Sequence, residues 1–87
     1  LIITENGAAF PDTLQNNRVH DPKRLQYIQN ILQQVLRAKQ EGVNVNGYFV
    51  WTFLDNFEWA EGYHPRFGLV HVDFQTQQRT VKASGHW

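Results

Sequence analysis

One long amphipathic helix, predicted for residues 22–41 between two short apolar runs, constrains the fold more than any other feature of this sequence. Asp21 and Pro22 favour its start, because aspartate is a common N-cap and proline is tolerated at the first helical position. Gly42 favours its end. Between them, apolar side chains recur at steps of three and four residues, as in Leu25, Ile28, Leu32, Val35 and Leu36. Such a stripe requires a partner surface.

The two apolar runs, residues 1–4 and 48–54, are predicted to be strands. Both are almost continuously apolar, which is typical of strands that are covered on both faces. Two strands joined by a helix lie parallel, with a right-handed connection. The sequence therefore predicts an α/β fold built on a strand–helix–strand unit. Residues 8–19 are expected to be a loop, and residues 68–74 and 79–81 to form a hairpin around a polar turn.

The beginning of the sequence already has the character of a strand interior, since Leu1, Ile2 and Ile3 are all apolar and the chain contains no methionine. We therefore expect residues 1–87 to be one piece of a longer protein, incomplete as an independent domain. No apolar run approaches the roughly 18 residues that a membrane span requires.

The composition argues against several kinds of partner. Lysine plus arginine and aspartate plus glutamate both number 8, so the net charge is zero. Nucleic acids and anionic membranes need a clustered positive field, so neither is an expected partner. The chain has no cysteine, its histidines lack metal-ligand spacing, and no glycine pattern suits a phosphate. We expect no cofactor and no metal, and the lack of cysteine slightly favours a cytoplasmic location.

Polar residues follow the ends of both predicted strands, and nine of the twelve aromatic residues lie between residues 48 and 74. Glu5 follows the first strand, and a polar cluster follows the second, namely Asp55, Asn56, Glu58 and Glu61. The carboxyl ends of parallel strands meet at one face of an α/β protein, where sites form. Carboxylates among indoles suit a neutral ligand that is rich in hydroxyl groups.

Each candidate also has a purely structural interpretation. Glu5 could act as a nucleophile or general base, or be a solvated loop carboxylate. Trp51 lies inside an apolar run, which favours a core residue. Glu58 could bind the hydroxyls of a ligand, or form an internal ion pair with Arg66 or Arg18.

Asp55 and Asn56 are expected to cap the turn after the second strand, because both residue types hydrogen-bond to nearby backbone in turns.

Two motifs resemble the family-one glycoside hydrolases, the β-glucosidase family. Residues 3–7 are similar to the family's I-T-E-N-G signature, and residues 51–59 to its W-S-L-L-D-N-F-E-W. Shorter elements follow in order, at residues 62–63, 66–70, 72–73 and 79–84, where Val81 replaces the usual proline. Thr52 and Phe53 are mild departures from the second motif. The resemblance therefore extends over the whole chain.

The resemblance implies the C-terminal portion of a (β/α)₈ TIM barrel, about its last two β/α units. It also implies a retaining β-glucosidase in which Glu5 is the nucleophile. By the same resemblance, Glu58 and Trp59 hold hydroxyls of the non-reducing sugar. Trp51 stacks below that sugar, and Phe67 forms a wall near its exocyclic carbon.

The resemblance also bears on the substrate. In the branch of the family that acts on 6-phosphorylated sugars, a serine with a nearby lysine and tyrosine binds the phosphate. Here Glu58, Trp59 and Phe67 occupy that region, and a carboxylate would repel a phosphate dianion. An unphosphorylated β-glucoside or β-galactoside, as a small glycoside or an oligosaccharide, is therefore the expected ligand.

The acid/base glutamate belongs to the family's N-E-P motif, which does not occur in this chain. The chain alone is therefore expected to be inactive and to need the remainder of the barrel as a partner. Two alternatives stay open. One is a non-catalytic carbohydrate-binding module with Trp51 and Trp59 as a stacking platform, although such modules are usually antiparallel β-sandwiches. The other is a protein-interaction domain that uses the aromatic surface.

Overall fold

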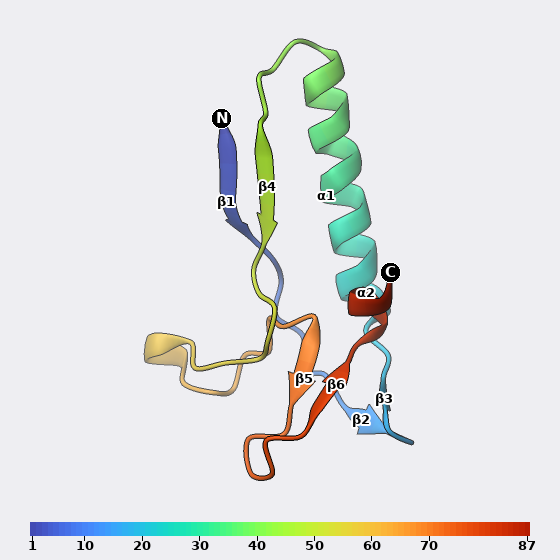
Figure 1. Cartoon of the computed structure of the whole chain (residues 1–87), viewed down its shortest axis with the longest axis vertical. Helices are drawn as coiled ribbons and strands as arrows, with labels where there is room; N and C mark the ends of the chain where they lie inside the picture. The colour runs from blue at the N-terminus through green and yellow to red at the C-terminus, as the bar shows by residue number, and fades with distance from the viewer.

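A computed structural model describes the whole chain, from Leu1 to Trp87. Its central unit is β1 (Ile2–Asn6), α1 (Pro22–Gln40) and β4 (Gly47–Val50), with β1 and β4 paired in parallel (Figure 1). The strand–helix–strand prediction is thus confirmed. The second strand ends at Val50 and not at Leu54, which forms only an isolated parallel bridge with Val70.

The C-terminal end of α1 lies where the sequence predicts it. Gly42 has a φ of +99°, which costs a glycine nothing. Its N–H donates to the carbonyl of Lys39 (3.1 Å), and the N–H of Val43 donates to that of Ala38 (3.0 Å). These two bonds form a Schellman motif, which satisfies carbonyls that the helix itself leaves free.

The N-terminal end differs from the prediction in one respect. Pro22 begins the helix and Asp21 stands at the N-cap position, but the Asp21 side chain makes no capping hydrogen bond. Its carboxylate instead accepts hydrogen bonds from Arg24 and from both the backbone N–H and the hydroxyl of Ser84. Arg24 and Ser84 therefore bind the carboxylate oxygens that would otherwise accept hydrogen bonds from the first backbone N–H groups of α1.

Smaller elements complete the chain. β5 (Val70–Val72) and β6 (Arg79–Val81) form the predicted antiparallel hairpin. Residues 14–19, expected as loop, contain a second antiparallel hairpin of β2 (Leu14–Gln15) and β3 (Arg18–Val19). A short 3₁₀ helix η1 (Trp59–Glu61) and a one-turn helix α2 (Ala83–His86) follow β4 and β6. None of the helices is long and apolar enough to cross a membrane.

Charged side chains are buried more completely than apolar ones. Arg24 and Lys82 are the largest fully buried side chains, with 1% and 0% of their surface exposed. The apolar core contains only Val19, Ile28, Val45, Val70 and Val72. Eleven large apolar side chains remain exposed, and β1 and β4 pair only with each other, so no barrel closes within the chain.

We expect the isolated 87-residue chain to be poorly folded or to associate, because exposed apolar surface and unpaired strand edges favour aggregation. Sedimentation velocity should show oligomers, and circular dichroism should show no sharp thermal transition. A monomer with a cooperative transition and dispersed amide signals would contradict this expectation.

Candidate functional site

Glu5 lies near the carboxyl end of β1, at an irregularity in the pairing. The register passes from Ile3 opposite Tyr48 to Asn6 opposite Val50, so β1 contains one more residue than β4 between these pairs. An extra residue of this kind forms a bulge, which changes the direction of nearby side chains. The Glu5 side chain is exposed, and none of the six ion pairs in the chain includes it. Its carboxylate is therefore open to a ligand.

The backbone next to Glu5 is held tightly against the end of β4. The N–H of Trp51 donates to the carbonyl of Asn6 (2.8 Å), and the Tyr48 hydroxyl donates to Oδ1 of Asn6 (2.8 Å). A Cβ at Gly7 would lie 1.7 Å from the Trp51 carbonyl oxygen, so only glycine fits. Burial raises the pKa of Tyr48, which keeps its hydroxyl a donor at neutral pH.

Trp51 and Glu58 are in direct contact. The indole Nε1 of Trp51 donates a hydrogen bond to Oε1 of Glu58 at 3.1 Å, and both side chains are half-buried. Neither alternative ion pair of Glu58 forms. Arg66 binds Asp55 instead (2.7 Å), and Arg18 belongs to none of the six ion pairs. The place of Trp51 in an apolar run predicted a core residue. The structure shows instead that its side chain is only half-buried.

Trp59 and Phe67 have different surroundings. Trp59 opens η1 with 84% of its surface exposed, and its φ of +51° is uncommon for a bulky residue. Phe67 is half-buried, and its carbonyl accepts a hydrogen bond from the N–H of Thr52 (3.2 Å). The segment that carries Phe67 therefore runs beside the one that follows Trp51, whereas the indole of Trp59 lies largely in solvent.

Residues 55–66, which we call the projecting loop, extend away from α1 and the β5–β6 hairpin, in yellow in Figure 1. Asp55 closes its base: Oδ2 accepts a hydrogen bond from Nη1 of Arg66 (2.7 Å), and Oδ1 from the N–H of Gly68 (2.9 Å). The prediction of a turn cap at Asp55 is therefore wrong, because this carboxylate is only 3% exposed and binds distant groups. Asn56 does bond locally, to the carbonyl of Leu54 (3.1 Å).

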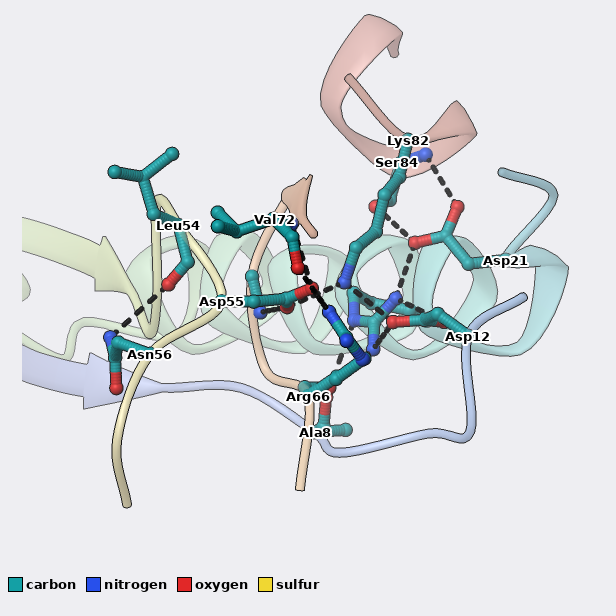
Figure 2. A network of polar contacts seen from close by, with 12 residues as sticks. Ala8, Asp12, Asp21, Leu54, Asp55, Asn56, Arg66, Val72, Lys82 and Ser84 are labelled. Atoms are coloured by element: carbon teal, nitrogen blue, oxygen red, sulfur yellow. Dashed lines mark hydrogen bonds and ion pairs between the residues drawn. The ribbon is translucent and has the colours of Figure 1, made fainter. Parts of the chain in front are cut away.

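Asp55 belongs to a buried set of five ion pairs that alternate in sign, which we call the ion-pair chain (Figure 2). Its members in spatial order are Asp21, Arg24, Asp12, Lys82, Asp55 and Arg66. Figure 2 shows the Lys82 side chain descending from the C-terminal segment between Asp55 and Asp12. All members have side-chain exposures of 0–2%, except Arg66 at 20%. Sequence reasoning missed this cluster as such.

Arg24 uses all five of its N–H groups within the ion-pair chain and the nearby backbone. It forms a bidentate pair with Asp12 (3.0 and 2.8 Å), and donates to Asp21 (2.6 Å) and to the carbonyls of Ala8 (3.3 Å) and Arg66 (2.7 Å). Burial alone would lower the pKa of Arg24, but hydrogen bonds to Asp12 and Asp21 hold it above its ordinary value. The buried charge is thus fully compensated.

Burial and nearby charges also shift the pKa values of Asp55 and His71. Burial alone would raise the pKa of Asp55, but hydrogen bonds from Lys82 and Arg66 hold it below its ordinary value, so the carboxylate is ionised at neutral pH. His71 is buried with no partner for Nδ1. Burial and the charge of Arg66 lower its pKa, so the imidazole is neutral and adds no further cation. No group of three or more acidic or histidine side chains is arranged to hold a metal ion.

Comparison with known proteins gives one consistent result. A family model described as Glycosyl hydrolase family 1 matches residues 1–87. "Beta-glucosidase A" of Thermotoga maritima is 58% identical over 86 residues, which cover 98% of this chain and 19% of that protein. The "1,4-beta-D-glucan glucohydrolase" of Thermotoga neapolitana is 57% identical over 86 residues, with the same coverage of 98% and 19%.

Solved structures agree with the sequence comparison. The psychrophilic β-glucosidase BglU from Micrococcus antarcticus has a TM-score of 0.96 and 59% identity, over 99% of this chain and 19% of that one. A complex of the Thermotoga maritima β-glucosidase with castanospermine has a TM-score of 0.96 and 57% identity, over 99% and 20%. The chain thus spans about a fifth of the length of these relatives.

Replacing Lys82 by methionine in a longer protein that contains residues 1–87 should lower the free energy of unfolding by about 3–5 kcal/mol, because Asp12 and Asp55 would stay buried without their shared cation. The matched control is Lys23→Met, at an exposed lysine outside all ion pairs, which should change it by less than about 0.5 kcal/mol. Denaturant midpoints compare the two variants, and equal midpoints would contradict the role of Lys82.

Proposed function

The chain belongs to glycosyl hydrolase family 1, and on that premise we propose that it forms part of a longer retaining β-glucosidase. The substrate is the terminal, non-reducing β-D-glucosyl or β-D-galactosyl residue of a small glycoside or oligosaccharide. The 87 residues supply about the last two β/α units of a (β/α)₈ barrel. The unpaired edges of β1 and β4 take neighbouring strands from the remainder of that barrel.

Glu5 is the proposed nucleophile. Its exposed carboxylate lies at the bulge near the end of β1 and has no cation beside it to neutralise it. The hydrogen bonds of Asn6 with Trp51 and Tyr48 hold the adjacent backbone in place, which limits the freedom of an attacking group.

The reaction proceeds in two displacements. A Glu5 oxygen attacks the anomeric carbon as the bond to the aglycone oxygen breaks, and a second carboxylic acid protonates the departing oxygen. That second group then removes a proton from water, which attacks the anomeric carbon and releases Glu5. The two inversions give net retention and need carboxyl groups about 5–5.5 Å apart. The family resemblance assigns the second acid to an N-E-P motif outside these 87 residues.

The observation that carries the sugar-binding assignment is the hydrogen bond from Trp51 to Glu58 (3.1 Å). It occupies one lone pair of Oε1 and leaves the Oε2 atom of Glu58 to accept sugar hydroxyls. It also orients the Trp51 indole, whose ring face can stack on a pyranose. Trp59 supplies an exposed indole N–H. Phe67 supplies an apolar wall, at the point where its carbonyl accepts the hydrogen bond from the N–H of Thr52.

The alternative of a carbohydrate-binding module is less well supported. A carbohydrate-binding module would usually be an antiparallel β-sandwich, whereas the largest unit here is a parallel pair joined by a 19-residue helix. The Thermotoga maritima β-glucosidase has been solved with castanospermine and with noeuromycin. We propose that this chain contributes to binding a small sugar-like molecule in its own protein.

Incubating the longer protein with a 2-deoxy-2-fluoro glucoside that carries a good leaving group should trap a covalent intermediate on a peptide that contains Glu5. The fluorine slows both displacements, but the good leaving group keeps the first fast enough for the intermediate to accumulate. Glu5→Gln should abolish both the label and turnover while the thermal transition stays intact. Glu41→Gln is the control, since that exposed carboxylate pairs only with Arg37 at the helix end. A label on another residue would refute the assignment of Glu5.

The longer protein should cleave an unphosphorylated β-glucoside with a kcat/KM about 100-fold or more above that for the 6-phosphorylated glucoside, because like charges placed together cost several kcal/mol. Removing the charge with Glu58→Gln should narrow this ratio. Comparable kcat/KM values for the two substrates in the unaltered protein would contradict the expectation.

A further inference from the structure

The projecting loop carries Glu58 and Trp59, yet few contacts hold it to the rest of the chain. One is the hydrogen bond from Trp51 to Glu58. A second is a row of tilted rings, in which Phe57, Tyr63 and Phe74 have centroid distances of 5.3 and 4.8 Å. Phe57 and Tyr63 are themselves more than half exposed. The remaining attachment is at the base of the loop.

We propose that Asp55 is a positioning residue for sugar binding: its carboxylate, with Lys82 as buried counter-ion, clasps both ends of the projecting loop and thereby places Glu58 and Trp59. This inference rests on the proposed function, because it assumes that these two residues hold the sugar. It goes beyond that proposal in assigning a role to two residues that do not touch the ligand.

The hydrogen bonds of Asp55 show why a carboxylate is required. Oδ1 accepts from the N–H of Gly68 (2.9 Å) and from Nζ of Lys82 (2.8 Å). Oδ2 accepts from Nη1 of Arg66 (2.7 Å) and, more weakly, from the N–H of Val72 (3.4 Å). All four partners are donors. An asparagine would therefore direct its amide N–H₂ at a cation in either orientation, so no neutral isostere can preserve the clasp.

The second end of the loop is fixed by more than Asp55. Nη1 of Arg66 also donates to the carbonyl of Val72 (2.9 Å), and its guanidinium lies 4.6 Å from the centroid of the Phe74 ring. The Arg66 carbonyl in turn accepts a hydrogen bond from Arg24 (2.7 Å). Because Arg24 and Lys82 both bind Asp12, the clasp is one end of the ion-pair chain and is connected through it to α1. The loop thus inherits its position from the most deeply buried charges of the chain.

The clasp and the nucleophile are separate. Glu5 lies on β1, whose end is held by Tyr48 and Trp51, and neither β1 nor those two residues bond to the Asp55 carboxylate. Loosening the clasp should therefore weaken sugar binding more than it alters the attack by Glu5. A residue that served stability alone would show no such selectivity at temperatures well below unfolding.

The test compares Asp55→Asn with Asp21→Asn in the longer protein. Both aspartates are buried members of the ion-pair chain. Asp21 makes no hydrogen bond to residues 55–66 and reaches them only through Arg24, which Asp12 also holds. Asp55→Asn should raise KM for 4-nitrophenyl β-D-glucoside at least about tenfold, with a smaller change in kcat. It should also speed hydrogen exchange in residues 56–65. Asp21→Asn should lower the unfolding midpoint while leaving KM and the exchange of the loop unchanged.

Arg66→Gln is a second variant that opens the same clasp from its partly exposed side, and it should give the same pattern if Asp55→Asn fails to fold. Equal KM values and equal loop exchange in the Asp55, Arg66 and Asp21 variants would overturn the positioning role. Failure of the proposed function looks different: the unaltered protein would neither cleave the glucoside nor label at Glu5. Loop exchange would still report then on whether Asp55 holds the loop.

Discussion

The pairing of Asp12 with both Arg24 and Lys82 is the interaction on which the remaining structure depends. It joins a residue of the first loop to α1 and to the segment before α2, and it lets each cation bind a further carboxylate. Three acidic and three basic side chains alternate, so the set is neutral as a whole. Removing a charge from water is costly. Because the signs alternate, each charge that is buried inside the set lies beside opposite charges whose attraction offsets that cost.

Charged and apolar side chains have different roles in this structure. The chain has few buried apolar side chains, so the elements within it are held at their common junction mainly by directional contacts. Apolar surface is instead left on β1, β4 and the projecting loop, in side chains such as Ile2, Phe49 and Phe57. Directional contacts fix angles and distances better than apolar contacts do. That property suits a junction from which the projecting loop, the proposed carrier of two sugar-binding residues, extends.

The sequence predicted the elements that rest on local physics. The helix from Pro22 to Gln40 follows from apolar spacing and terminal residues, and the β5–β6 hairpin from a polar turn between apolar runs. Glu5 and Glu58 became candidates because each follows a predicted strand, whereas Trp51 lay inside one. The roles of all three came from a family resemblance. Neither source indicated the bulge next to Glu5, because the register of a strand depends on its partner.

Local sequence patterns could not predict the ion-pair chain either, because most of its paired members are far apart in the sequence. Asp55 was predicted to cap a turn because aspartate commonly hydrogen-bonds to nearby backbone after a strand. Its actual partners Arg66 and Lys82 lie 11 and 27 residues away. Lys82 did appear in the R-T-V-K-A-S element of the family resemblance, and that was the only sequence signal for it. Buried lysine is rare enough that composition alone gives no reason to expect one.

The contact between Lys82 and Asp12 also has a consequence for the order of events when the polypeptide is made. The two residues are 70 positions apart, so it is among the longest-range contacts of the segment. A ribosome releases Asp12, Asp21 and Asp55 well before it releases Lys82. Until then, two of these carboxylates lack the cation that they share in the finished structure. The junction can therefore close only after Lys82 has left the ribosome, and the carboxylates made before it must stay hydrated until then.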